Sequence, residues 1–396
     1  MKRSIVAVAA LAALAACAEQ GAAPTAADRS APVLSRSDAG KYIVVLEEGA
    51  NPRAVAAVAG VEPRYVYTAA LNGFAASLNA GQLNALEHMG AVEYIEADAP
   101  VELLTTQSGA TWGIDRIDQR DTPLSTTYTY TSTGLGVNAY VLDTGIRLTH
   151  AEFGGRAQYV PNGKNGNFVG DNATADDCQG HGTHVAGTIG GATWGVAKAA
   201  TLWAARVVNC SGSGDASMVI AGMDWVAANG LKPGVVNMSL GYGNVQSVRD
   251  AATRLVSAGF FVVAAAGNGN IFGIPQNACS QAPAGAPTVM TVGATTSSDA
   301  ESSFSNYGTC VDILAPGSSV TSANYTSASG SSVKSGTSMA SPHVAGVGAL
   351  YLALNPLATP AQVTSALKAN GTSNTITLHS RSRTYGTPNL FLFTNY

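Results

Sequence analysis

The 396-residue sequence has few charged side chains: Asp, Glu, Lys and Arg make up 12%, against about 25% in an average soluble protein. Lys plus Arg is 21 and Asp plus Glu is 25, so the net charge is −4. This balance excludes the basic excess with which a nucleic-acid-binding protein neutralises phosphates. No apolar run of about eighteen residues follows the N-terminus, which argues against a polytopic membrane protein. The length and the 46% of apolar residues instead predict two or three folded domains.

The first segment predicts export. Lys2 and Arg3 precede an apolar stretch, 5–16, that is too short to cross a bilayer but suits the core of a secretory signal. This stretch ends in Leu14-Ala15-Ala16-Cys17, which resembles a bacterial lipoprotein signal, whose cysteine is lipidated. We therefore expect a secretion signal over 1–17 with a lipid on Cys17. Cleavage at an Ala-x-Ala site without a lipid is the alternative.

Cysteine is scarce, and four cysteines remain once Cys17 is assigned to the signal. An even number of cysteines in an exported chain predicts two disulfides, and the sequence alone permits three pairings. The four residues are Cys178, Cys210, Cys279 and Cys310.

Composition divides the rest of the chain into three parts. Residues 18–40 are rich in Ala, Ser, Pro and Asp without periodicity, which predicts a flexible spacer. A small α+β unit is expected over 41–104, and a large segment follows over 105–396. In the small unit we expect strands at 41–47, 73–78 and 92–97, a helix at 80–89 and a short helix within 51–59. Polar and small residues at 101–108 predict an exposed linker.

The large segment alternates apolar strands with helical stretches. Such alternation predicts an α/β domain with a mostly parallel sheet and helices on both faces. The expected strands are 136–142, 201–208, 235–238, 260–266 and 289–292, and the expected helices are 184–189, 216–229, 248–258 and 342–354.

Three junctions between elements carry reactive side chains. Asp143 follows an apolar strand directly, at the carboxyl end where open α/β sheets assemble their sites. His181 lies in Gly-His-Gly-Thr-His-Val-Ala-Gly, at a glycine-flanked helix start. Ser338 lies in Gly-Thr-Ser-Met-Ala-Ser-Pro-His-Val-Ala-Gly, a loop that turns into a helix with Pro342 in its first turn. Unpaired backbone N–H groups and the helix dipole there would stabilise a developing oxyanion.

Each junction also has a purely structural explanation. Asp143 could cap a turn, His181 or His184 could be a core histidine, and Ser338 could be a helix N-cap. Two histidines three apart suggest zinc, but no acidic residue or third histidine follows at helical spacing. The order Asp, His, Ser, each in a glycine-bearing motif, matches an orienting carboxylate, a base and a nucleophile. The G-x-S-x-G motif of α/β-hydrolases is absent around Ser338, which argues against lipases and esterases.

The three motifs resemble those of the subtilases. The run Trp-Gly-Ile-Asp-Arg-Ile-Asp-Gln-Arg at 112–120 is similar to the mature start of the proteinase K group, particularly its aqualysin-like bacterial branch. The resemblance covers 105–396 and, more loosely, 41–104. It implies a subtilisin-like three-layer peptidase domain. It also implies that 41–104 is an inhibitor-like propeptide with a ferredoxin-like fold, which assists folding and blocks the active site.

The resemblance assigns roles to individual residues. Ser338 would attack the peptide carbonyl, His181 would transfer the proton, and Asp143 would orient the imidazole. Asn268 matches the family's oxyanion asparagine, which acts together with the backbone N–H of Ser338. Other residues would pair with an extended peptide or line the primary pocket: Gly212, Ser213, Gly214, Ser239, Leu240, Gly241, Ala265, Ala266 and Gly267. The sequence departs from the family at Tyr242, usually glycine, and at Ala216, an aromatic residue in proteinase K.

The resemblance also implies disulfides and calcium. The aqualysin-like pairs would be Cys178 with Cys210 and Cys279 with Cys310. One structural Ca²⁺ would be held by Asp312 and the carbonyls of Pro287 and Val289, since carboxylate and carbonyl oxygens are its ligands. Part of a second, weaker site matches Asp115, Asp118 and Gln119. There Ser125 and Thr127 replace the acidic and amide side chains of relatives.

The resemblance therefore implies a secreted, monomeric serine endopeptidase of broad specificity that prefers an apolar or aromatic side chain in its primary pocket. Its partners would be protein and peptide substrates and its own propeptide, with no nucleic acid, and membrane contact only through a lipid on the precursor. Autocleavage is expected between Leu103 and Ser108, after Leu104. Two alternatives are a catalytically silent binding protein and a processing protease with narrow targets. A shortage of acidic residues in the pocket argues against the second.

Overall fold

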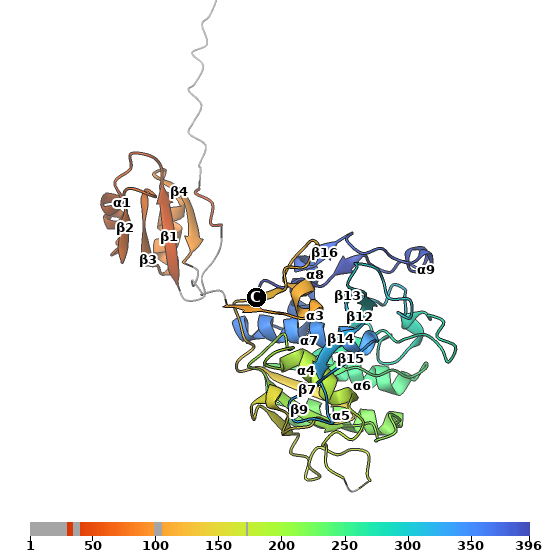
Figure 1. The fold of residues 1–396 in the computed structure, drawn as a ribbon. Helices are drawn as coiled ribbons and strands as arrows, with labels where there is room; N and C mark the ends of the chain where they lie inside the picture. The colour runs from red at the N-terminus through yellow and green to blue at the C-terminus, as the bar shows by residue number, and fades with distance from the viewer. Residues whose placement is uncertain (1–29, 35–39, 99–104, 172) are drawn as a thin grey trace, which may run out of the picture. The chain divides into compact units, whose positions relative to one another are not determined.

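The computed structural model describes residues 30–34, 40–98, 105–171 and 173–396. The chain separates into two compact units, one up to Glu102 and one from Leu103 (Figure 1). The predicted signal, Cys17, most of the spacer and the expected cleavage point after Leu104 lie outside the described residues. None of the helices in the described part combines the length and the apolar character needed to span a bilayer.

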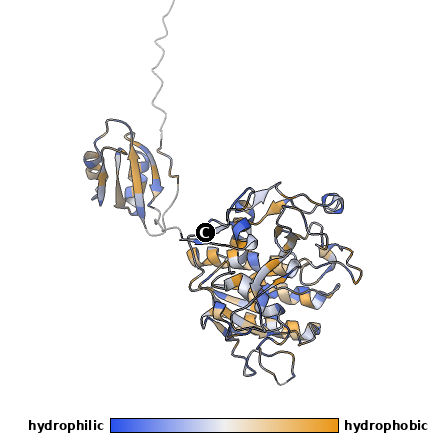
Figure 2. Cartoon of the chain, viewed as in Figure 1, coloured by the Kyte–Doolittle hydropathy of each residue, from blue (hydrophilic) through white to orange (hydrophobic). Residues whose placement is uncertain are grey.

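The small unit is a four-stranded antiparallel sheet with two helices. Its elements are β1 (Lys41–Leu46), α1 (Pro52–Val58), β2 (Tyr65–Tyr67), β3 (Gly73–Ser77), α2 (Ala80–Glu87) and β4 (Val92–Ala97). The strand order β2-β3-β1-β4 and this chain order give the ferredoxin-like arrangement that was expected. Val44, Phe74, Leu86 and Ile95 are fully buried in its core, and the central strands are correspondingly hydrophobic (Figure 2). β2 is the strand that the sequence analysis missed.

The end of the predicted spacer belongs to this unit, which corrects one expectation. Ala31 is buried and its N–H donates to the carbonyl of Glu87 (2.6 Å). Val33 forms a parallel bridge to Ile95. The prediction of a flexible spacer is therefore wrong for residues 31–34, because their backbone hydrogen-bonds to the edge strand β4.

The large unit is built on a nine-stranded sheet. Its order is β16-β17-β13-β12-β11-β10-β7-β9-β8, parallel except for the pair β16–β17. The strands are β7 (Asn138–Asp143), β8 (Ala157–Tyr159), β9 (Thr201–Arg206), β10 (Gly234–Met238), β11 (Phe261–Ala265), β12 (Met290–Thr295), β13 (Ile313–Pro316), β16 (Thr372–Ser373) and β17 (Leu390–Phe391). The expected mostly parallel sheet is confirmed.

Helices cover both faces of this sheet. The α-helices of this unit are α3 (Trp112–Ile117), α4 (His181–Gly190), α5 (Ala216–Asn229), α6 (Gln246–Ser257), α7 (Thr337–Leu354), α8 (Pro360–Asn370) and α9 (Ser380–Thr384). Of these, α4 and α7 pack on one face of the sheet, and α5 and α6 pack on the other. Alternate residues of β7 enter different cores: Ala139 and Val141 join the core with α4 and α7, whereas Tyr140 and Leu142 join the core with α5 and α6. α4 and α7 pack side by side (Figure 1).

Two antiparallel strand pairs complete the large unit. β14 (Val320–Ala323) pairs with β15 (Ser331–Lys334) as a hairpin, and β5 (Thr105–Ser108) pairs with β6 (Thr127–Tyr130) across the segment that contains α3. The β5–β6 pair corrects the expectation of a linker at 101–108. Its four residues from 105 are largely exposed but form a strand, because β6 supplies the backbone partners.

Candidate active site

Asp143 and His181 are brought together where β7 ends and α4 begins. His181 Nδ1 lies 2.8 Å from Oδ1 and 3.0 Å from Oδ2 of Asp143. The Asp143 side chain is buried, whereas 27% of the His181 side chain is exposed. Burial by itself would lower the pKa of His181, but the charge and hydrogen bond of Asp143 outweigh it, so this pKa lies above its ordinary value. One ring nitrogen is thus oriented by a carboxylate.

Two glycines at the start of α4 leave room for its neighbours: Gly180 for the ring of Tyr325, and Gly182 for the segment Asp143–Gly145. Gly180, before the helix, has a φ of 96°, and a Cβ there would lie 2.3 Å from the ring of Tyr325. A Cβ on Gly182 would lie 2.1 Å from the carbonyl oxygen of Gly145 and 3.1 Å from the Asp143 Cβ. The glycine-flanked histidine of the sequence motif therefore reflects the space available between α4 and the end of β7.

Ser338 is the second residue of α7, in the first helical turn. This corrects the expected helix start, because Pro342 lies inside the helix. Since proline has no N–H, it cannot donate to the carbonyl of Ser338, four residues earlier. The Ser239 hydroxyl donates to that carbonyl instead (2.8 Å), and the Ser338 hydroxyl donates to the carbonyl of Ser239 (3.0 Å). The loop after β10 thus compensates for the proline and holds Ser338.

Buried polar groups fix Ser239 in turn. Asn237 on β10 is fully buried, and its Nδ2 donates to the Ser239 hydroxyl (2.9 Å). The Ser341 hydroxyl, also buried, donates to Asn237 Oδ1 (2.7 Å). The first turn of α7 is therefore tied to β10 by side chains that satisfy one another.

Asn268 lies beside the start of α7, at the end of the segment that follows β11. Its Oδ1 accepts from both the N–H and the hydroxyl of Thr337, each at 2.8 Å. The Thr337 hydroxyl also accepts from the N–H of Gly267 (3.0 Å). With Oδ1 engaged in this way, Nδ2 faces Gly336, where a Cβ would lie 3.2 Å away. The amide is therefore oriented as a donor next to Ser338.

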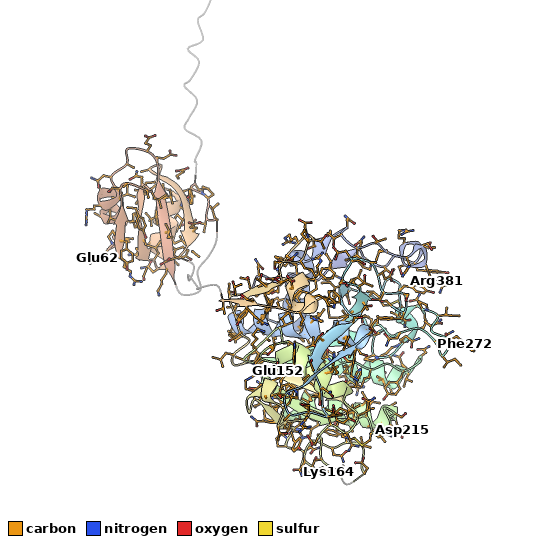
Figure 3. The ribbon with its side chains drawn as sticks, in the orientation of Figure 1. Glu62, Glu152, Lys164, Asp215, Phe272 and Arg381 are labelled. Atoms are coloured by element: carbon orange, nitrogen blue, oxygen red, sulfur yellow. A yellow bond between two sulfur atoms is a disulfide. The ribbon has the colours of Figure 1, made fainter. Side chains whose placement is uncertain are left out.

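A cavity of about 390 Å³ opens in front of Asp143 and His181. Six of the nine residues expected to bind substrate line it, in two runs, Gly212–Gly214 and Ser239–Gly241. The other three, Ala265–Gly267, do not line it. Ala265 ends β11, the strand adjacent to β10, and the other two follow it, so all three lie near the Ser239 run at the carboxyl end of the sheet. Asp215, which follows the first run, starts α5 (Figure 3).

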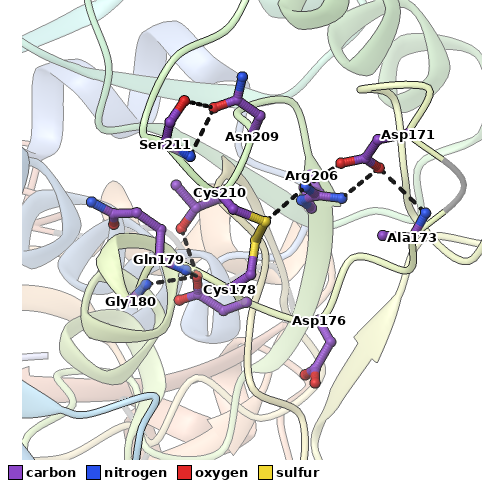
Figure 4. Close-up of a disulfide and its surroundings, with 12 residues drawn as sticks. Asp171, Ala173, Asp176, Cys178, Gln179, Gly180, Arg206, Asn209, Cys210 and Ser211 are labelled. Carbon is purple, nitrogen blue, oxygen red and sulfur yellow. Dashed lines mark hydrogen bonds and ion pairs between the residues drawn. A yellow bond between two sulfur atoms is a disulfide. The ribbon is translucent and has the colours of Figure 1, made fainter.

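Both disulfides join the pairs that the resemblance implied, Cys178–Cys210 and Cys279–Cys310. The first lies beside Gln179 and Gly180, the two residues that precede His181 (Figure 4). Next to it the fully buried Arg206 forms a two-fold ion pair with Asp171 (2.8 and 2.6 Å) and donates to Cys210 Sγ (3.4 Å). The Arg206 hydrogen bonds hold the pKa of Asp171 well below its usual range.

The chain also matches known families and proteins. The model of the subtilase family matches residues 134–387, and that of the peptidase inhibitor I9 family matches residues 41–104. The chain belongs to the subtilase family.

Individual proteins are also similar to the chain. The chain is 47% identical to an extracellular serine proteinase of Thermus sp. (strain Rt41A), over 94% of this chain and 95% of that protein. It is 43% identical to a cuticle-degrading protease of Metarhizium anisopliae, over 79% of each. A crystal structure of a cold adapted subtilisin-like serine proteinase superimposes with a TM-score of 0.67 at 47% identity, covering 73% of this chain and all of that one. The protein is thus a subtilisin-like serine endopeptidase with an I9 propeptide.

The sequence motifs did not indicate several residues of this subtilase's site. Thr144, Gln179 and Val208 line the cavity, as does Tyr242, which was already noted as a departure from the family pattern, and Thr337 orients Asn268. Gln179 accepts from the N–H of His181 (2.9 Å), and Tyr242 forms a two-way backbone bridge with Ala282. Burial and the nearby charge of Asp215 raise the pKa of Tyr242. Only proximity to the motifs could have indicated Thr144, Gln179 and Thr337.

Two other histidines in the motifs are structural. His184 is fully buried, and its Nε2 faces the carbonyls of Val320 (3.0 Å) and Ser332 (3.2 Å). His343 is buried, and its Nδ1 faces the carbonyl of Met339 (2.8 Å). Because carbonyls only accept, each facing ring nitrogen carries a hydrogen. Burial lowers the pKa of His184 to about 3 and that of His343 to about 4, so both are neutral near pH 7.

Proposed function

We propose that Ser338 is the nucleophile, His181 the general base and Asp143 the carboxylate that orients it. The Asp143–His181 pair at 2.8 Å is the observation that carries this assignment. Ser239 connects the pair to Ser338, since it lines the same cavity and accepts from the Ser338 hydroxyl. For attack that hydroxyl turns to Nε2 of His181, which takes the proton and then gives it to the leaving amine. Water hydrolyses the acyl-enzyme by the same steps.

The oxyanion of each tetrahedral intermediate would be bound by Nδ2 of Asn268 and the backbone N–H of Ser338. Thr337 donates two hydrogen bonds to Oδ1 of Asn268, which leaves the NH₂ group of this amide to donate to the oxyanion. Ser338 lies within the first turn of an 18-residue helix, where N–H groups lack intrahelical acceptors and the dipole favours negative charge. These donors are in place before reaction, which is the condition for strong electrostatic stabilisation.

The substrate backbone would lie extended between Gly212–Gly214 and Ser239–Gly241, pairing with both runs as an added strand. Small residues at Ala265–Gly267 support a primary pocket that accepts an apolar or aromatic side chain. Asp143 is the one carboxylate among the residues that line the cavity, which argues against selection of basic side chains. A broad endopeptidase therefore fits better than a narrow processing protease.

Export and self-processing complete the proposal. The relative from Thermus is named extracellular, and residues 1–17 have the composition of a secretion signal. Cleavage after Leu104 would release an enzyme that begins with β5 and is free of any lipid on Cys17. The pairing of β5 with β6 would then hold the new N-terminus.

Calcium has two candidate positions, and the described residues fit them differently. No group of three or more His, Cys, Asp or Glu side chains gathers in the described part of the chain. Asp312 is engaged: Oδ1 lies 3.0 Å from Nζ of Lys368, and Oδ2 accepts from the N–H of Thr291 (3.0 Å). A Ca²⁺ held by Asp312, Pro287 and Val289 would have to displace Lys368.

The position at Asp115 and Asp118 fits a cation better. Asp118 Oδ1 is buried without a hydrogen-bond partner, while Oδ2 accepts from the N–H of Thr129. Burial and the charge of Asp115 raise the pKa of Asp118 to about 6. Both oxygens of Asp115 already accept from Ser125 and Thr126, and Gln119 Oε1 accepts from Ser125. A Ca²⁺ bound by Asp118 would neutralise this pair and stabilise the loop 119–127.

The experiment that tests the proposal compares the full-length chain with its Ser338→Ala variant. We expect the wild type to trim itself to a product that begins near residue 105 and to digest casein, and the variant to remain long and inactive. Repeating the assay with a calcium chelator is expected to lower thermal stability before activity. If wild type and variant process and digest alike, Ser338 is not the nucleophile. If both are silent but folded, the binding-protein alternative replaces the proposal.

A further inference from the structure

Asp177 is a carboxylate near the site that the catalytic assignment does not use. Only 8% of it is exposed, and it lies immediately before the disulfide residue Cys178. Its Oδ1 accepts from the Thr144 hydroxyl (2.9 Å) and from the N–H groups of Gln179 (2.9 Å) and Gly180 (2.8 Å). Its Oδ2 accepts from the N–H (2.9 Å) and the hydroxyl (2.7 Å) of Thr183. Both oxygens are therefore saturated with hydrogen bonds.

These bonds connect the two segments that carry the Asp143–His181 pair. Thr144 follows Asp143, and its hydroxyl also accepts from the N–H of Gly182 (2.9 Å). Thr183 lies in the first turn of α4, and its hydroxyl accepts from the N–H of Arg147 (2.9 Å). Asp177 thus bridges the loop after β7 to the start of α4, on either side of the 2.8 Å contact between Asp143 and His181.

The hydrogen-bond donors to Asp177 are all neutral. Among the ion pairs of the described residues, none includes Asp177. A buried carboxylate without a cationic partner is costly to maintain. During the reaction a positive charge forms nearby, when His181 takes the proton of Ser338. The charge of Asp177 favours that cation, as does that of Asp143, whereas Lys334 on β15 opposes it. His184, neutral and one turn along α4, also interacts with His181.

We propose that Asp177 is a positioning residue that holds Asp143 and His181 in register and, by its buried charge, stabilises the protonated state of His181. This inference rests on the proposed function and deepens it. The enzyme then surrounds its imidazolium with two carboxylates: Asp143 in direct contact, and Asp177 acting through Thr144, Thr183 and the field across the start of α4. The Cys178–Cys210 disulfide anchors the segment from which Asp177 projects.

The test is the pH dependence of kcat/KM for a chromogenic peptide substrate, measured on mature wild type and the Asp177→Asn variant. Asparagine keeps the size and one acceptor oxygen but removes the charge. We expect the acid limb, which reports the pKa of His181, to move to lower pH by about half a unit or more. We also expect kcat to fall about ten-fold or more with KM little changed, since the loss concerns the transition state. The shift should persist in 0.5 M salt, about the regime that screens exposed charges, because Asp177 is buried.

Two matched variants separate charge from general damage. Asp176→Asn removes the same charge from the adjacent residue, which is exposed and directed away from the disulfide (Figure 4); its acid limb and kcat should equal those of the wild type. Thr183→Val removes a hydrogen bond to Asp177 but keeps the carboxylate. It should lower kcat while leaving the acid limb in place.

The results also distinguish this inference from the proposed function. An active wild type with an unmoved acid limb in Asp177→Asn would overturn the role of the Asp177 charge, whereas an inactive wild type would overturn the catalytic assignment itself. If Asp177→Asn does not mature, Thr144→Val provides the second test, because it breaks the connection at Asp143 without altering charge. Unchanged kcat in Thr144→Val would then refute the positioning role, and a selective fall in kcat would support it.

Discussion

The two helices that carry the proposed catalytic residues begin in different ways. α4 begins at His181, and a buried carboxylate, Asp177, holds its first turn. α7 begins one residue before Ser338, and neutral groups, the Asn268 amide and the Thr337 hydroxyl, hold its start. In the proposed mechanism a cation forms at His181 and an anion forms next to Ser338. Each helix start is thus stabilised by the groups that suit the charge that forms beside it: a carboxylate near the cation, and oriented donors near the anion.

Among the variants that test the difference between the two helix starts, Asn268→Ala is expected to have the largest effect on activity. The variant removes one oriented donor from the α7 side, so kcat should fall by about 100- to 1,000-fold, as is typical for one oxyanion-hole donor. KM should change little, because the donor acts on the developing oxyanion. The measurement is steady-state kinetics on a peptide substrate from pH 5 to 10.

The acid limb of the pH profile tests the difference between the two helix starts more directly than the fall in kcat does. Asn268 carries no charge and contacts Thr337 rather than α4, so its loss should leave the apparent pKa of His181 in place. A variant that loses activity and also moves the acid limb would contradict the division between the two helix starts.

The disulfides provide the next comparison. Each closes a loop of about thirty residues, 32 and 31 apart in sequence, so replacing either pair with serine should cost roughly 3 to 4 kcal/mol in the chain-entropy model. Only the pair Cys178–Cys210 adjoins Asp177. We therefore expect loss of that pair to lower kcat as well as stability, whereas loss of Cys279–Cys310 lowers stability alone. Guanidinium unfolding and active-site-titrated kcat measure the two quantities.

The two double variants control for each other, since their disulfides close loops of nearly equal length and both exchange two cysteines for serines. Equal kcat values in both, with similar losses of stability, would show that the segment around Asp177 does not depend on its disulfide.

Sequence reasoning reached the sheet, its helices and the Asp143–His181 contact because motifs and hydrophobic alternation are local signals. It placed the α7 start five residues late at Pro342, because proline favours the first turn of an isolated helix. In the folded chain Ser239, about a hundred residues earlier, satisfies the carbonyl that the proline leaves free. Such a compensation is tertiary and leaves no local pattern.

The same reason explains the other differences. The sequence of residues 105–108 predicts a linker, because these polar residues have no strand pattern of their own and form a strand only by pairing with β6. The resemblance implies that Asp312 binds calcium, which stays a prediction; what the sequence could not indicate is that Lys368, 56 residues away, lies against its carboxylate. Asp177 drew no attention, because its importance lies in five donors from four residues and not in a motif.

The last comparison uses the buried histidines, one on each helix, and concerns stability at low pH rather than activity. His184 on α4 has a pKa lowered to about 3, and His343 on α7 has one lowered to about 4. The ordinary value is 6.5, so below pH 6.5 the unfolded chain binds protons that the folded chain excludes. The contribution of each neutral histidine to the free energy of unfolding is therefore fully present above pH 6.5. It decreases as the pH drops, by up to about 1.4 kcal/mol per pH unit for each histidine.

Glutamine variants resolve the two contributions, because glutamine keeps a donor but does not titrate. With mature enzyme blocked at Ser338 by phenylmethylsulfonyl fluoride, guanidinium midpoints between pH 7 and 3.5 should fall less steeply in His184→Gln and His343→Gln than in wild type. The reduced slope should extend to lower pH for His184, because its folded-state pKa is the lower of the two. Parallel slopes in all three proteins would mean that neither ring is held neutral. A reduced slope that extends to lower pH in His184→Gln than in His343→Gln would show that α4, which carries the proposed base His181, excludes a buried positive charge more strongly than α7 does.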